Sequence, residues 1–134
     1  MAETKAVNPW KWQDQLSIGF SQGIDVRGAE RVLYCAGQTS VDADGAPMHA
    51  GDMAAQMNQA IDNLETVLRQ AGLKLANVVR LNYYTRDVPA FIEAVSTFGP
   101  RLQAAGCRPA STLLGVTTLF HPHILVEIEA TAVV

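Results

Sequence analysis

Two glutamates near the end of the chain are the residues whose types and spacing point most directly to chemistry. Glu127 and Glu129 stand two residues apart in the alternating run 124–133. Side chains two apart on a strand point to the same side, about 7 Å apart by the rise of the strand. Carboxyls this close can shift each other's pKa and divide acid work from base work. An exposed polar face, or one ion-paired glutamate, is the alternative.

Further candidate binding residues lie at two strand ends. The stretch 37–40, Gly-Gln-Thr-Ser, leaves an apolar segment, where backbone N–H groups and a hydroxyl can meet a ligand; it is equally a simple exit to a loop. Arg108 follows a predicted helix, so its guanidinium can hold a substrate carboxylate or satisfy free carbonyls of the helix end. Tyr83 and Tyr84 face opposite ways on a predicted strand, with one ring in the core and one in a pocket or interface.

The sequence does not indicate metal chemistry. The histidines are too few and too scattered for a zinc site, and the pair around Pro122 is typical of a solvated loop. Cys35 and Cys107 indicate two reduced thiols rather than a disulfide. The P-loop, GxGxxG, HExxH and GxSxG patterns do not occur in the sequence. We therefore expect no metal site.

The elements that must position these residues alternate between strands and helices. Strands are predicted over 16–21, 31–36, 78–86, 111–119 and 124–133, with a turn at 23–28. An apolar stripe predicts a helix over 52–71, with Gln56 and Asn63 among the polar residues off the stripe. A second helix starts near Pro89, and Pro100 is expected to kink or shorten it. The order β-β-α-β-α-β-β predicts a two-layer α+β fold, a mixed sheet with both helices on one face.

Composition bounds the class of protein. The 134 residues, 49% hydrophobic and 17% charged, predict a single domain over 1–134 with a core of its own. A net charge of −3 argues against a nucleic-acid partner. No apolar run could span a membrane and no secretion signal is evident, so we expect a cytoplasmic protein. The second sheet face has no third layer to cover it, which predicts a homo-oligomer.

Eight short strings, taken in order, are similar to those of one known family. They are CAGQTSVD (35–42), GDMAAQ (51–56), DNL (62–64), AGL (71–73), VVRL (78–81), TRD (85–87), RPAST (108–112) and VEIEA (126–130). Over residues 20–132 this order resembles the RidA/YjgF family of reactive-intermediate deaminases, long labelled endoribonuclease L-PSP.

The resemblance implies a chorismate-mutase-like α+β fold that assembles as a homotrimer with ligand clefts between subunits. It implies hydrolysis of small enamines or imines such as 2-aminoacrylate to a keto acid and ammonia, with no metal or organic cofactor. Glu127 would position the attacking water. The substrate-binding residues implied by the matching motifs are Phe20, Ala36, Gly37, Gln38 and Tyr84.

The chain departs from the family pattern at the substrate carboxylate. The family's deaminases have Pro-Ala-Arg-Ser where this chain has 109–112, Pro-Ala-Ser-Thr, so Ser111 stands in the arginine's place. Phe20 likewise replaces a common tyrosine. Loss of a charge-assisted contact costs about 1.5–3 kcal/mol. The expected outcomes are a different substrate, replacement of the missing arginine by Arg108, or a trimer that binds a small molecule without turning it over. The ribonuclease suggested by the old label is disfavoured by the acidic charge.

Overall fold

The computed structural model describes residues 1–12 and 19–134. Its elements are β1 (Glu3–Val7), β2 (Gly23–Arg27), β3 (Val32–Gln38), α1 (Met53–Gln70), the 3-10 helix η2 (Leu75–Asn77), β4 (Val78–Thr85), α2 (Val88–Ala104), β5 (Ala110–Gly115) and β6 (Val126–Val133). β1 and β2 pair as an antiparallel ribbon, and the remaining strands form a four-stranded sheet in the order β3-β6-β4-β5.

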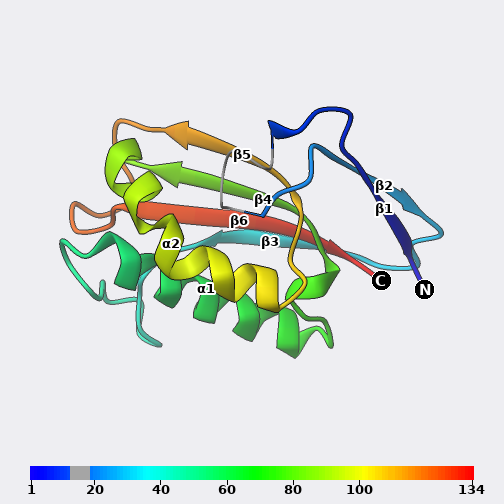
Figure 1. The fold of residues 1–134 in the computed structure, drawn as a ribbon. Coiled ribbons are helices and arrows are strands. Elements are labelled where there is room, and N and C mark those ends of the chain that lie inside the picture. Colours follow the sequence, from blue (N-terminus) through cyan, green and yellow to red (C-terminus); the bar gives the residue numbers. More distant parts are fainter. Residues whose placement is uncertain (13–18) are drawn as a thin grey trace.

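The four-stranded sheet is mixed, as the sequence predicts. β6 runs antiparallel to both of its neighbours, β3 and β4, whereas β4 and β5 are parallel. A parallel pair needs a crossover connection, and α2 provides it. Both helices pack side by side on the same face of the sheet (Figure 1). The two-layer α+β class is therefore confirmed.

The N-terminal part differs from the sequence prediction. Residues 16–18 of the first predicted strand lie outside the described residues, and Phe20 belongs to no strand. The turn predicted over 23–28 is wrong, because Gly23–Arg27 forms β2 and pairs with β1. In β2, Ile24 and Val26 alternate with charged residues, a strand pattern that the flanking glycines obscured. Among the described residues, three strands precede α1, where the sequence predicted two.

Each helix begins after an aspartate that caps it. Oδ1 of Asp52 accepts a hydrogen bond from the Ala55 N–H at 3.0 Å, and Asp87 caps α2 in the same way. α2 continues past Pro100 to Ala104, so the proline does not shorten it. Arg101, the next residue, ties this last part of α2 to α1 through Asp62, Glu65 and the Asn58 carbonyl. No helix among the described residues has the length and apolar character to cross a membrane.

The core between the layers centres on three aromatic rings. Tyr83 of β4 packs on Phe91 of α2, with ring centroids 5.2 Å apart, and Phe91 packs on Phe98 at 5.3 Å. All three side chains are buried. Cys35 and Cys107 are buried free thiols, as the sequence predicts. Because Tyr83 is fixed in the core, its neighbour Tyr84 must point to the other face of the sheet.

That other face, which we call the open face, lies opposite both helices (Figure 1). In β6 the residues Val126, Ile128 and Ala130 are buried while the residues between them are partly exposed. On the open face, Tyr34 is 79% exposed and Leu114 is 50% exposed. The two glutamates of interest therefore lie on a surface that the helices leave accessible.

Candidate active site

Three strands bring Glu127 beside an aromatic and an aliphatic side chain. The register places Glu127 opposite Tyr84 in the β6–β4 ladder, and Tyr84 opposite Leu114 in the β4–β5 ladder. Ladder partners point to the same side of a sheet. Glu127, Tyr84 and Leu114 therefore form one row across the open face, at the ends of β4 and β5.

On the β3 side, the Glu127 carboxyl lies directly over Gly37. A β-carbon at position 37 would stand 2.7 Å from Cδ and 3.0 Å from Cγ of Glu127, which is closer than atoms can approach. Only glycine leaves room for this carboxyl. Ala36 and Gln38 flank the same point, and the Gln38 side chain donates to the Ala36 carbonyl at 3.1 Å. The structure thus brings five of the sequence-predicted site residues to one place: Ala36, Gly37, Gln38, Tyr84 and Glu127.

The pairing of β3 with β6 is irregular where the Glu127 carboxyl lies over Gly37. Cys35 pairs with Ala130, but the next pair is Gln38 with Ile128. Three residues of β3 therefore span two residues of β6, which is a β-bulge. A bulge re-aims the backbone, and Gly37 lies within this one, beneath the Glu127 carboxyl.

The two glutamates lie in different environments. Burial raises the pKa of Glu127, and the negative charge of Glu129 raises it further. Glu129 accepts hydrogen bonds from the Tyr84 hydroxyl and from Nδ2 of Asn82, and these bonds lower its pKa. The bond to Glu129 in turn raises the pKa of Tyr84. Glu127 is therefore the carboxyl suited to take up and release a proton, while Glu129 is held as an anion.

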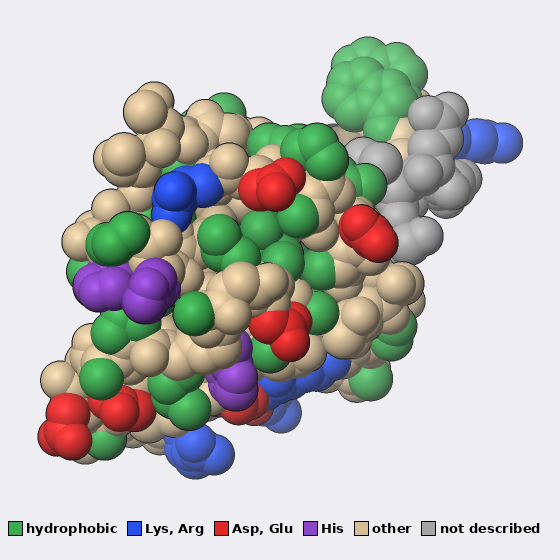
Figure 2. All heavy atoms as spheres, turned by 90° about the vertical axis from the view of Figure 1, so that its left-hand side faces the viewer, with side chains coloured by type: hydrophobic (Ala, Val, Ile, Leu, Met, Phe, Trp, Pro, Cys, Tyr) green, Lys and Arg blue, Asp and Glu red, His purple; other side chains and the backbone are tan. Residues whose placement is uncertain are grey.

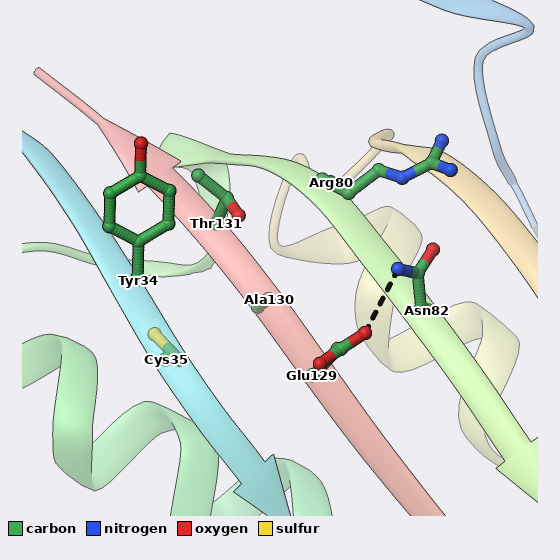
Figure 3. A pocket seen from close by; sticks show the side chains of 7 residues that line it. All are labelled: Tyr34, Cys35, Arg80, Asn82, Glu129, Ala130 and Thr131. Atoms are coloured by element: carbon green, nitrogen blue, oxygen red, sulfur yellow. Dashed lines mark hydrogen bonds between the residues drawn. The ribbon is translucent and has the colours of Figure 1, made fainter.

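A shallow pocket of about 230 Å³ extends along the open face beyond this row (Figure 3). The residues that line it are Tyr34, Cys35, Arg80, Asn82, Glu129, Ala130 and Thr131. Arg80 donates to the Thr112 hydroxyl at 3.2 Å, and Oδ1 of Asn82 is buried without a hydrogen-bond partner among the described residues. The pocket offers a cation, an anion and a free acceptor, a set that suits a small polar molecule.

The other sequence-predicted site residues lie at the start of β5. Ser21, next to Phe20, donates from its backbone N–H to the Pro109 carbonyl at 2.9 Å, and from its hydroxyl to the Arg108 carbonyl at 2.7 Å. These bonds hold Phe20 close to Arg108. The Arg108 side chain is exposed. Ser111 stands beside buried Leu81 in the ladder, so it points to the helix side of the sheet.

Within one chain this second group is remote from Glu127. Ala110, at the start of β5, pairs with Arg80, whereas Glu127 pairs with Tyr84. Four residues of strand separate those two levels, about 13 Å along the sheet. The site residues that the sequence predicts therefore fall into two groups, one at each end of the sheet.

Metal ligands do not converge in the described part of the chain. No three histidine, cysteine, aspartate or glutamate side chains of residues 1–12 and 19–134 come together as ligands could. His121 and His123 stack edge to face with ring centroids 5.0 Å apart. The His123 N–H donates to Nδ1 of His121 at 3.0 Å, which uses one ring nitrogen for the turn.

Comparison with known proteins assigns the chain to a family. The family model described as endoribonuclease L-PSP matches residues 14–134. The chain belongs to this family. The RidA/YjgF resemblance expected from the sequence is thereby confirmed, and the match spans all the elements from β2 to β6.

Among its relatives, the 2-iminobutanoate/2-iminopropanoate deaminase of Escherichia coli K12 is 28% identical over 115 residues, 85% of this chain and 86% of that protein. A RutC family protein of Aquifex aeolicus is 29% identical over 114 residues, 85% and 87% of the two chains. The solved structure of the Rid family protein YyfB from Yersinia pestis has a TM-score of 0.84 and 32% identity, and covers 98% of both chains.

In this RidA/YjgF-family chain, Tyr34, Arg80 and Asn82 are residues of the open face to which the sequence assigned no role. The alternation of β4 placed Arg80 and Asn82 on the same side as Tyr84. Their meeting with Tyr34 depends on β6 lying between β3 and β4. This order of strands is a long-range feature that local patterns do not contain.

Proposed function

We propose that this RidA/YjgF-family protein is a hydrolase of the deaminase type. It acts on a small enamine or imine in a cleft between the subunits of a homotrimer, and Glu127 orients the attacking water. The observation that carries the proposal is the Glu127 carboxyl, seated over Gly37 on the open face with a raised pKa. The name of the E. coli relative, which is a 2-iminobutanoate/2-iminopropanoate deaminase, supports the substrate class.

Hydrolysis of an imine needs a group that takes a proton from the attacking water and gives one to the leaving nitrogen. In hydrolysis of an imine, water adds to the C=N carbon, the C–N bond breaks, and the products are a carbonyl compound and ammonia. Glu127 accepts a proton from the attacking water and returns it to the departing nitrogen. A carboxyl with a raised pKa is better matched to both steps than an ordinary one. Glu129, held as an anion by Tyr84 and Asn82, stabilises positive charge that develops on the nitrogen.

The separation of the two residue groups supports a cleft between subunits. Arg108 cannot reach the Glu127 carboxyl of its own chain across about 13 Å of sheet, but a second copy on the open face can supply it. Exposed Tyr34 and Leu114, and Oδ1 of Asn82, which has no partner in the part of the chain that the structure describes, are consistent with burial of this face in an assembly. Arg108 would hold the substrate carboxylate and Phe20 would line that side of the cleft, whereas Ser111 points to the helix side of the sheet.

Subunit complementation tests the proposal. Glu127→Gln and Arg108→Ala are each purified and also co-expressed, with the mass of the assembly measured by light scattering. Hydrolysis of 2-iminopropanoate, generated in situ from serine by a dehydratase, is followed as pyruvate formation above the spontaneous rate. Glu93→Gln, an exposed glutamate of α2, is the matched control.

Each parent variant is expected to lose at least about tenfold in kcat/KM. The mixed assembly is expected to regain activity, because some clefts receive an intact Glu127 from one subunit and an intact Arg108 from another. An active wild type with fully active Arg108→Ala would remove Arg108 from the cleft. Wild-type activity in Glu127→Gln would overturn the mechanism.

A second candidate is a trimer that binds a small molecule without turning it over. Ser111 stands where the family's deaminases have arginine, and its hydroxyl is 3.4 Å from the Pro109 carbonyl. An inactive wild type that binds pyruvate or 2-oxobutanoate in calorimetry would favour this candidate. The cytoplasmic location and the absence of a cofactor expected from the sequence stay predictions.

A further inference from the structure

The helix α1 carries two amide side chains that hydrogen-bond to loop backbone rather than to solvent. Gln56 is fully buried, contrary to its predicted place on the polar side. Its Nε2 donates to the His123 carbonyl at 2.7 Å and to the His49 carbonyl at 3.2 Å, while its Oε1 accepts from the Leu125 N–H at 2.8 Å. Every polar group of this amide is used, which offsets the cost of burying it.

Asn63 makes the matching contacts seven residues, about two turns, further along α1. Its Nδ2 donates to the Thr39 carbonyl at 2.8 Å and to the Val41 carbonyl at 3.0 Å. Its Oδ1 accepts from Nε2 of Gln59 at 3.0 Å. A spacing of seven places Asn63 on the same side of the helix as Gln56.

The two amides hold the backbone next to Glu127 on β6 and next to Gly37 on β3. Leu125, held by Gln56, stands two residues before Glu127; Thr39, held by Asn63, stands two residues after Gly37. Thr39 lies in the loop after β3, and Leu125 lies in the loop before β6. Both loops lie at the end of the molecule that faces the viewer in Figure 2, where the histidine side chains are seen among hydrophobic ones. One rigid helix therefore fixes both partners of the contact between Glu127 and Gly37.

The hydrogen bonds of Gln56 and Asn63 are needed because the β3–β6 pairing does not by itself set the distance between Glu127 and Gly37. The β3–β6 register shifts between Cys35 and Gln38, so the seat lies in a bulge without regular pairing. We infer that Gln56 and Asn63 are positioning residues, which set the distance between the start of β6 and the end of β3 and so keep the Glu127 carboxyl over Gly37. The inference rests on the proposed function for its effect on rate, but not for its effect on Glu127 itself.

The test uses three full-length variants. Gln56→Met keeps the side-chain length and removes the polar contacts, and Asn63→Ala removes the second set from a less buried position. Arg101→Met is the control. Arg101 links α2 to α1 through Asp62 and Glu65, yet it contacts neither the loop of Thr39 nor the loop of Leu125. The pKa of Glu127 is measured by carbon NMR of the carboxyl, and kcat and KM are measured with 2-iminopropanoate.

We expect the Glu127 pKa to fall towards its ordinary value in Gln56→Met and in Asn63→Ala, because a displaced carboxyl regains water. We expect kcat to fall about 10- to 100-fold in both variants with a smaller change in KM. Arg101→Met should lose stability and keep the wild-type pKa and kcat.

Three outcomes overturn the inference. They are an unchanged Glu127 pKa in folded Asn63→Ala, an unchanged kcat in that variant, or an equal pKa shift in Arg101→Met. If Gln56→Met fails to fold, Asn63→Ala decides the matter alone. An inactive wild type would refute the proposed function, while the pKa measurement would still test the positioning role.

Discussion

Gly37→Ala is expected to disturb the candidate site while leaving the stability of the fold almost unchanged. Its new β-carbon would stand 2.7 Å from Cδ of Glu127, whereas carbon atoms in contact lie about 3.5–4.0 Å apart. The Glu127 carboxyl must therefore move by about 1 Å. A displacement of this size at a reacting group costs about 100-fold in rate. We expect kcat to fall by that order and the Glu127 pKa to decrease, because the carboxyl moves towards solvent.

Stability should change little in the same variant. The φ angle of Gly37 lies outside the left-handed region, so alanine meets no backbone strain there. Alanine stabilises by about 0.4–1 kcal/mol through the unfolded chain, and an off-rotamer Glu127 costs about 0.5–1.5 kcal/mol. These effects nearly cancel, and Tm should shift by no more than a few degrees.

The assay compares Gly37→Ala with Gly23→Ala, a strand glycine of β2 whose new β-carbon would lie an ordinary 3.6 Å from the Val7 Cβ. The kcat for 2-iminopropanoate, the NMR titration of Glu127 and thermal unfolding are measured on both. Wild-type kcat and an unshifted Glu127 pKa in Gly37→Ala would refute the reasoning. A large loss of Tm would show that Gly37 serves the fold rather than the site.

Three other substitutions test the electrostatics and the core. In Glu127→Gln, stability should exceed that of the wild type at pH 7 and equal it below about pH 4. The reason is that a raised carboxyl pKa in the folded state makes ionisation oppose folding; urea unfolding at both pH values checks this, and a pH-independent difference would contradict it. In Tyr84→Phe, the pKa of Glu129 should rise towards its ordinary value, so less stability is lost as pH falls through that pKa; an unmoved NMR titration of Glu129 would count against the hydrogen bond. Phe98→Ala should cost about 3–5 kcal/mol, because Phe98 is fully buried and packs against Phe91 and Tyr83; a loss under about 1 kcal/mol in urea unfolding would show that the cluster is not packed as described.

The parts of the fold predicted from the sequence are those that local patterns determine. The stripe and cap of α1 and the alternation of β6 are each contained in one continuous segment, so α1 and the shared face of Glu127 and Glu129 were predictable. The pairing of β1 with β2 joins an exposed strand to a partly exposed one, and the glycines that flank β2 indicated a turn there. The burial of Gln56 depends on backbone groups of two distant loops, and a polar residue beside an apolar stripe does not reveal such partners.

The seat of Glu127 shows the same limit at the candidate site. Gly37 and Glu127 were both candidates from the family resemblance, but their contact follows from a bulge between strands about ninety residues apart in the sequence. Arg108 and Ser111 are separated from Glu127 because β5 starts at the Arg80 level of β4, whereas β6 starts at its Thr85 level. Residue types and spacing can therefore suggest the participants, while only the pairing and register of the strands show which of them meet in one chain.

The rate of 2-iminopropanoate hydrolysis by the wild type and by Glu127→Gln decides whether Glu127 acts in this reaction. Both proteins are compared at equal concentration and assembly state, with Glu93→Gln alongside. We predict pyruvate formation above the spontaneous rate for the wild type and for Glu93→Gln, and at least a tenfold loss of kcat in Glu127→Gln. Equal rates for the wild type and Glu127→Gln would show that Glu127 does not act in this hydrolysis.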